Sequence, residues 1–318
     1  MGRSSFVVKV GRLLQALPLR ALQCLEWPWL FNCRANVPSA VFILAIPRGG
    51  STLSFQVICH SMVVLYLSNI WNLLFQLPLF GGIVSKVLTR RHCSEFLSQH
   101  GFVEGLDGPA EGLRFWEWWL GCGLSDESCR SMPADRKHRR VVYISKVLKV
   151  LTSQNCPFVS AYLGHTLVPD TLASSFPDAV YIRIRRDPIA NALSLLRSTR
   201  QSGGTWFSVV PQECKDEEGL NEHERVAAQV YWLNRRLDDS EVSRRSLTVH
   251  YEALCENPGR ELDRIRQHCA DFGIKPPSRR SLPARFDFKT PDLVYDQDAL
   301  KIKAALQSLE LRHGKLAD

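Results

Sequence analysis

The chain has 318 residues, 45% of them hydrophobic and 23% charged, and its formal net charge at pH 7 is +8. This composition excludes general disorder and provides enough apolar side chains for the core of one large domain or two ordinary ones. The positive charge suits anionic ligands, nucleic acid and acidic membrane surfaces equally, so it does not choose among them. Its ten cysteines form no CxxC pair, which predicts reduced buried thiols rather than a zinc site.

The N-terminal segment, residues 1–38, is apolar but is interrupted by Lys9, Arg12 and Arg20, so no stretch of it can span a bilayer. This pattern favours an amphipathic segment that caps the domain, with a membrane-surface position as the alternative. Because no signal peptide or signal anchor is visible, we expect a cytoplasmic protein, and peripheral contact with a membrane stays open.

Residues 40–46 form a near-continuous apolar run, which is typical of a parallel strand buried on both faces. The turn at 47–50 interrupts this run, and the Ser-Thr pair after it can begin a helix. Unpaired N–H groups at a helix N-terminus favour anions, and the two glycines of the turn allow an anion to approach the backbone closely. Arg48 adds a permanent positive charge, so the sequence predicts an anion-binding turn.

The next part of the chain has an unusual composition, since residues 49–85 contain no Asp, Glu, Lys or Arg. A membrane span here would place this turn and the later strands on opposite sides of a bilayer, so one sheet could not form. We therefore predict a pair of buried core helices. The alternative is a lid over about residues 60–88 whose apolar face meets lipid or a hydrophobic acceptor.

Further strands are predicted at residues 180–184 and 247–250, each followed by a helix. Pro188 is suited to the first turn of one of these helices, and Gly273 ends the other, which begins at Pro258. Alternation of strands and helices predicts an α/β domain with a mainly parallel sheet. We place this domain at residues 39–295 and a C-terminal helix at 296–318.

Three segments, in this order, resemble motifs of the PAPS-dependent sulfotransferase superfamily, where PAPS is 3′-phosphoadenosine 5′-phosphosulfate. Residues 47–52, Pro-Arg-Gly-Gly-Ser-Thr, resemble the 5′-phosphosulfate loop P-[RK]-S-G-[ST]-T, with Gly49 in place of Ser. Arg186-Asp187-Pro188 followed by Ser194 resembles the 3′-phosphate motif, and residues 251–258 resemble the Y-E-D-L…P segment. The similarity covers about residues 40–275.

The resemblance implies a three-layer sulfotransferase fold with a central sheet like that of P-loop nucleoside triphosphate hydrolases. It also implies PAPS as the sulfuryl donor and PAP as the product. Arg48 would stabilise the charge that develops on the departing nucleotide, and no metal is expected because the sulfuryl group carries little charge. The implied donor residues are Arg48, Gly49, Gly50, Ser51 and Thr52 at the 5′-phosphosulfate, and Arg186 and Ser194 at the 3′-phosphate.

The general base is less clear. Cytosolic members of the superfamily use a His on a K-T-H strand, but simple register puts Ser160 and Tyr162 at the Lys and His positions. His165 lies three residues further on and is one candidate. Other members use a Glu, and Glu111 lies in a predicted tight loop before the aromatic run 115–119, which is either an apolar acceptor wall or core. An apolar wall would raise the pKa of this carboxyl group, so we rank Glu111 before His165.

We therefore expect an enzyme that transfers a sulfuryl group from PAPS to a hydroxyl of a glycan, a lipid-linked molecule or a hydrophobic alcohol. Trp206 and Phe207 lie in a glycine-flanked loop that suits such an acceptor. One alternative is a non-catalytic, membrane-peripheral protein that binds PAPS or PAP. A nucleotide kinase ranks lower, because we find neither a Gly-Lys-[Ser/Thr] loop nor an acidic magnesium ligand after a strand. We expect no nucleic-acid partner, and the oligomeric state stays open.

Overall fold

The centre of the protein is a sheet of five parallel strands in the order β2-β3-β1-β4-β5. The computed structural model describes residues 19–31, 39–90, 92–97, 102–288, 290 and 296–317. The predicted α/β fold with a parallel sheet is confirmed. The strands are β1 (Ala40–Leu44), β2 (Leu65–Tyr66), β3 (Phe158–Ser160), β4 (Val180–Arg185) and β5 (Ser246–His250).

Strand β1 is buried on both faces, which explains its continuous apolar sequence. Val41 and Ile43 belong to one hydrophobic core, whereas Phe42 and Leu44 belong to a second core on the opposite face. The first core is covered by α3 (Ser51–Ser61), α13 (Tyr251–Glu256) and α14 (Pro258–Asp271). The sheet is therefore the middle of three layers.

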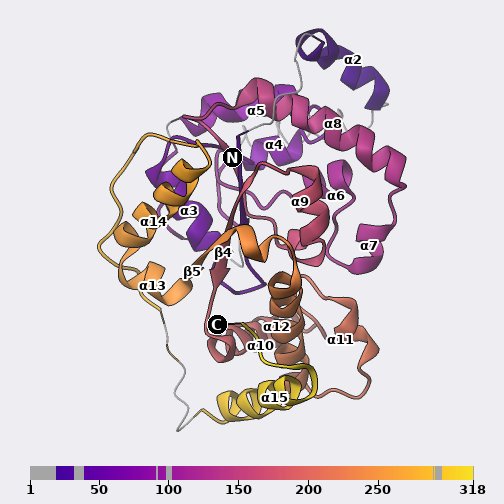
Figure 1. Ribbon diagram of the computed structural model, residues 1–318, viewed down its shortest axis with the longest axis vertical. Helices are drawn as coiled ribbons and strands as arrows, with labels where there is room; N and C mark the ends of the chain where they lie inside the picture. The colour runs from indigo at the N-terminus through magenta and orange to yellow at the C-terminus, as the bar shows by residue number, and fades with distance from the viewer. Residues whose placement is uncertain are drawn as a thin grey trace.

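The core on the Phe42 side is larger, and the remaining helices pack around it (Figure 1). They are α2 (Leu19–Leu30), α4 (Asn69–Leu73), α5 (Pro78–Thr89), α6 (Leu113–Leu120), α7 (Asp126–Arg130), α8 (Ala134–Leu151), α9 (Pro169–Ser175), α10 (Pro188–Ser202), α11 (Gln212–Asp216), α12 (Glu222–Asp239) and α15 (Gln297–His313). Two 3₁₀ turns, η1 (Leu163–Leu167) and η2 (Ser243–Arg245), complete the described elements.

The strand order brings distant parts of the sequence to one edge of the sheet. β4 pairs with β1 on one side and with β5 on the other, and all three strands are parallel. The carboxyl ends of parallel strands meet at the same sheet edge, so the segments that follow them are neighbours. Those segments are residues 45–52 after β1, residues 186–194 after β4, and α13 after β5.

The predicted strands at 40–46, 180–184 and 247–250 are confirmed, as are the helices that begin near Ser51 and at Pro188 and Pro258. The charge-free stretch 49–85 forms α3, β2, α4 and part of α5. In the part of the chain that the structure describes, no helix is long and apolar enough to cross a membrane.

The predicted N-terminal segment 1–38 contains α2, while its residues 1–18 and 32–38 lie outside the described part of the chain.

Candidate active site

The two anion-binding turns predicted from the sequence contact each other directly. Arg48 Nε donates a hydrogen bond to Ser194 Oγ at 3.1 Å, and Arg186 Nη1 donates to the carbonyl oxygen of Arg48 at 2.9 Å. Asn191 Nδ2 adds a third link, to the carbonyl oxygen of Pro47 at 2.8 Å. The two turns therefore form one structural unit, although they lie well over a hundred residues apart in the chain.

Tight packing requires glycine in the first turn. Gly50 has φ +99°, and a Cβ atom at this position would lie 2.2 Å from Cδ2 of Tyr251. A Cβ atom on Gly49 would lie 2.9 Å from the carbonyl oxygen of Ile46. Arg48 also adopts a positive φ of 62°, which is uncommon for a residue with a side chain and is found preferentially at functional sites.

The two helices that follow these turns begin differently. α3 starts after Gly50 with no side-chain cap, so the N–H groups of its first turn are left for a ligand. In α10 the Asp187 carboxylate caps the helix by accepting a hydrogen bond from Ala190 N at 2.7 Å. The helix end that is left without a side-chain cap is therefore that of α3, while Ser194 on α10 contacts Arg48.

The positive charge of this unit is not neutralised by the protein. Among the described residues, no carboxylate lies within ion-pair distance of Arg48 or Arg186. The Arg186 guanidinium lies 4.8 Å from the centre of the Tyr251 ring, and its Nε is buried without a hydrogen-bond partner. Burial and the nearby charge of Arg186 lower the pKa of Arg48. Two cations without a counter-charge, partly removed from water, are suited to a strongly anionic ligand.

A cavity of about 550 Å³ opens beside this unit. Arg48, Gly50, Ser51, Thr52 and Arg186, five of the residues predicted to bind the donor, contribute to its wall, and their role toward a donor stays a prediction. Ser194 and Gly49 do not line the cavity: Ser194 acts through its hydrogen bond to Arg48, and Gly49 lies behind the turn. Among the described residues, no group of three or more His, Cys, Asp and Glu side chains is placed to hold a metal ion.

Glu111 faces the same cavity from the loop before α6. The loop is held in place because Ala110 N donates to the carbonyl oxygen of Leu67 at 2.8 Å and Asn69 N donates to that of Gly108 at 3.0 Å. Burial raises the pKa of Glu111 to about 7. No hydrogen bond or ion pair with another described residue offsets this effect. A carboxyl group with this pKa can exchange a proton with a bound hydroxyl near neutral pH.

His165, the second predicted base, lies away from the cavity. It is fully buried in η1, with its ring 4.7 Å from the Trp116 ring, 5.2 Å from the Tyr162 ring and 5.5 Å from the Phe42 ring, measured between centroids. Neither ring nitrogen has a hydrogen-bond partner, and burial lowers the pKa of His165 to about 3. The structure therefore does not bring His165 together with the two turns.

The aromatic run after Glu111 is core, which is the one of the two alternatives that fits the structure, and it does not form an acceptor wall. Phe115, Trp116 and Trp119 are fully buried, and Trp116 Nε1 donates to Ser160 Oγ at 3.0 Å inside the core. The helical spacing of these residues turns them toward the sheet, so only the first residue of α6, Leu113, reaches the cavity.

The apolar wall of the cavity comes from other residues. Phe102, Val103, Leu113 and Phe207 line it. Of these, only Phe207 was expected at the site from the sequence. Tyr251, for which no role was predicted, also lines the cavity, and it contacts Gly50 and Arg186. The sequence did contain a sign of this position, because Tyr251 directly follows a predicted strand and residues after parallel strands meet at one edge of the sheet.

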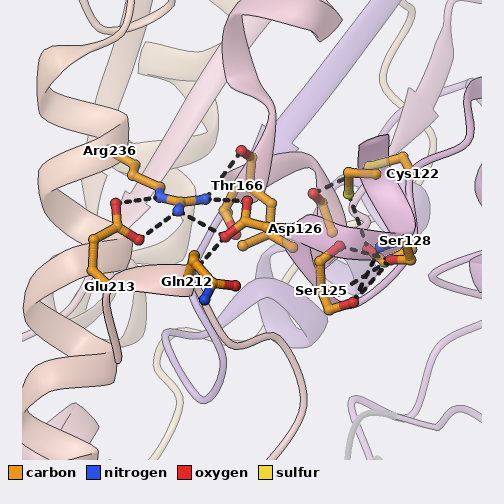
Figure 2. A network of polar contacts seen from close by, with 12 residues as sticks. Cys122, Ser125, Asp126, Ser128, Thr166, Gln212, Glu213 and Arg236 are labelled. Atoms are coloured by element: carbon orange, nitrogen blue, oxygen red, sulfur yellow. Dashed lines mark hydrogen bonds and ion pairs between the residues drawn. The ribbon is translucent and has the colours of Figure 1, made fainter. Parts of the chain in front are cut away.

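A cluster of paired charges around Arg236 anchors the chain near Phe207 (Figure 2). Arg236 binds both oxygens of Asp126 at 2.6 and 2.7 Å, and its Nε donates to Glu213 at 3.0 Å. Asp126 also accepts a hydrogen bond from Gln212 N at 2.6 Å. This cluster ties α7, α11 and α12 together, and so fixes the segment that leads from Phe207 into α11.

A family model described as "Sulfotransferase family" matches residues 38–271, which is most of the chain and includes both turns. The chain belongs to this family. A sulfotransferase STF9 from Mycobacterium avium superposes with a TM-score of 0.51 at 17% sequence identity, covering 95% of this chain and 74% of that structure. This likeness supports the sulfotransferase fold.

Two further solved structures are similar at lower scores. STF1 from Mycobacterium tuberculosis gives a TM-score of 0.45 at 13% identity, with 95% of this chain and 78% of that one covered. A sulfotransferase domain from the curacin biosynthetic pathway gives 0.42 at 15% identity, with 89% of each chain covered. Among curated protein sequences, none matches this chain significantly.

Proposed function

We propose that this sulfotransferase takes a sulfuryl group from PAPS and transfers it to a hydroxyl group of an acceptor with an apolar body. One observation carries the proposal. Arg48 and Arg186, two cations for which the described part of the chain provides no counter-charge, are joined in one unit, and Glu111, for which it provides no hydrogen-bond or ion-pair partner, faces the same cavity.

The residues present fit a bisphosphorylated nucleotide. The uncapped N-terminus of α3, with Ser51, Thr52 and Arg48, would hold the 5′-phosphosulfate. Arg186 would hold the 3′-phosphate, since its buried Nε lacks a partner, while Ser194, which does not line the cavity, would hold the Arg48 side chain in place through its hydrogen bond. When bound, PAPS supplies an activated sulfuryl group that can pass to an oxygen nucleophile.

Side chains of the protein would act on both the acceptor hydroxyl and the departing nucleotide. Glu111, in its ionised form, accepts the proton of the acceptor hydroxyl, and its raised pKa matches this task near neutral pH. Arg48 stabilises the negative charge that builds on the departing nucleotide, and its partial burial strengthens this interaction. The apolar residues around Glu111 limit the access of water to the bound hydroxyl.

The cavity lining favours one acceptor class among those expected from the sequence. Phe102, Val103, Leu113 and Phe207 form an apolar wall, while Asn69 and Asn72 contribute amide groups. An alcohol or phenol with a hydrophobic body can bury its apolar surface against this wall, which a bare glycan cannot do to the same extent.

Isothermal titration calorimetry with PAP, in the absence of Mg²⁺, tests the donor site. We expect micromolar binding, and Arg186→Ala should weaken it more than tenfold through loss of a charge-assisted contact worth at least about 1.4 kcal/mol. The matched control is Arg197→Ala, an exposed arginine on α10, the helix that follows Arg186, which should leave the affinity within about twofold. An unchanged dissociation constant in Arg186→Ala refutes the 3′-phosphate assignment.

A transfer assay with radiolabelled PAPS then separates the enzyme from a non-catalytic binding protein. Hydrophobic phenols, long-chain alcohols, lipid extracts and glycans serve as acceptors, and we expect label in the hydrophobic acceptors. Tight binding of PAP without transfer to any of them would favour the non-catalytic alternative.

A further inference from the structure

The outer surface formed by α2, α5 and α8 carries an unusual number of exposed large apolar side chains. Trp27, Trp29 and Phe31, in and just after α2, are 56%, 67% and 73% exposed, respectively. On α5, Phe80 and Val87 are also exposed, and Ile83 lies between them on the same helical stripe. Soluble proteins rarely leave such a group of aromatic residues in water without a partner. We call this surface the α2/α5/α8 face.

The orientation of α2 is fixed by the side of the helix that faces the body of the protein. Leu22, Glu26 and Leu30, four residues apart, form its buried stripe. The two carboxylate oxygens of Glu26 accept hydrogen bonds from Phe80 N at 2.8 Å and from the Tyr143 hydroxyl at 2.7 Å. These bonds tie α2 to α5 and α8, the group of helices along the top of Figure 1. Trp27 and Trp29 lie outside the buried stripe of α2 and are exposed.

The same three helices hold most of the net charge of the protein. Their sequences contain eight Lys and Arg residues and two acidic residues, which is +6 of the total of +8. One of the two acids, Glu26, is buried. Among the described residues, Arg136, Lys146 and Lys149 on α8 have no ion-pair partner. Lys86, Arg139 and Arg140 are engaged with the Leu151 carbonyl oxygen, the Asp135 carboxylate and the Trp118 carbonyl oxygen, respectively. The face is therefore apolar, and its cations without an ion-pair partner in the described part of the chain include Arg136, Lys146 and Lys149.

These two properties together select the partner. A nucleic acid would be attracted by the cations but would leave the exposed Trp and Phe side chains without apolar contacts. A second copy of the chain would place like charges opposite each other, at a cost in free energy. An anionic lipid bilayer satisfies both properties, because aromatic side chains enter the interface while Lys and Arg contact the headgroups.

We propose that the α2/α5/α8 face docks the protein on membranes that contain anionic phospholipids. Docking occurs in the plane of the interface, without a membrane-spanning segment. It rests on the exposed aromatic residues of α2 and the unpaired cations of α8, and it is independent of the reaction that the cavity performs.

Vesicle flotation with the full chain tests this proposal. Vesicles of phosphatidylcholine alone are compared with vesicles in which a quarter of the lipid is phosphatidylglycerol, at low and at high salt. We expect binding to the anionic vesicles at low salt, at least about tenfold weaker binding to the neutral ones, and partial loss at high salt.

Two double variants examine the two parts of the face. Trp27→Ser with Trp29→Ser, and Lys146→Glu with Lys149→Glu, should each weaken binding about tenfold or more. The matched controls are on α15: Leu311→Ser replaces a side chain that is 88% exposed, and Lys301→Glu with Lys303→Glu makes the same charge change on another surface. Both controls should bind vesicles as the unchanged protein does, and thermal melting verifies that all variants are folded.

Three results would overturn the proposal. The first is absence of vesicle binding at low salt. The second is equal loss of binding in the α15 charge control, which would mean attraction by net charge alone. The third is binding that survives the tryptophan change and is displaced by duplex DNA, which would indicate a nucleic-acid surface.

Discussion

Two regions of this protein bury charged side chains, and they do so in opposite ways. Around Arg236, every guanidinium N–H has an acceptor: the two carboxylates of Asp126 and Glu213 and the carbonyl oxygen of Leu167 (Figure 2). In the cavity, no carboxylate among the described residues lies within ion-pair distance of Arg48 or Arg186. The first region ties helices together, and the second leaves its charges available to a ligand.

The carboxyl groups of the two regions show the same contrast. Burial opposes ionisation of Asp126, but the hydrogen bonds and charge of Arg236 outweigh it and lower its pKa. Burial acts on Glu111 without such compensation, so the pKa of Glu111 rises to about 7. A group that is stabilised in its charged form supports the fold, whereas a group held near its titration point can transfer protons.

The largest effect is expected from Glu111→Gln. If Glu111 is the base, kcat should fall by about 10²–10⁴-fold while the affinity for PAP is unchanged. In the unchanged enzyme, kcat/KM should rise with pH and level off above about 7, as the carboxyl group loses its proton. Glu117→Gln, an exposed acid on α6, serves as the control and should retain full activity.

The same variant has a readout that does not depend on activity. In the folded protein Glu111 keeps its proton up to a pH of about 7, whereas in the unfolded chain it loses the proton near pH 4.5. The free energy of unfolding should therefore decrease as the pH rises from about 4.5 to about 7. Glu111→Gln should remove this part of the pH dependence in chemical denaturation. Turnover that survives in Glu111→Gln and is lost when His165 is replaced would reverse our ranking of the two bases.

Arg236→Ala should have the largest effect on stability. It would leave Asp126 and part of Glu213 without their partner, so we expect a loss of about 3–5 kcal/mol in the free energy of unfolding. Arg235→Ala, on the same helix and paired with the exposed Asp239, should cost less than about 1 kcal/mol. Equal stability of the two variants in urea denaturation would mean that the paired cluster is not a structural anchor.

Arg48→Ala should have the opposite profile to Arg236→Ala, with a large effect on activity and little effect on stability. We expect kcat to fall by about 10²–10³-fold, as in the removal of other groups that stabilise developing charge. Its stability should be unchanged or slightly higher, because the repulsion between Arg48 and Arg186 is relieved. Arg48→Lys retains the charge and should recover part of the rate. A loss of stability as large as that of Arg236→Ala would contradict the distinction between the two regions.

Local patterns predicted much of the fold and one half of the site. The apolar run of β1, the turn at residues 47–50 and Pro188 each place an element through short-range rules that neighbours in space do not override. The position of Glu111 in a loop beside the site could also be anticipated. The burial of His165 could not, because it depends on how η1 and α6 pack on the sheet.

The sequence by itself therefore determined the strand-and-turn units and the family that these motifs resemble. Only the tertiary structure decided which charges are paired and which are free. Pairing depends on side chains from separate elements meeting within a few ångströms: Arg236 meets Asp126 across 110 positions of the chain, while no acid reaches Arg48 among the described residues. Such distances follow from the strand order and the packing of helices, which residue types and local periodicity do not encode.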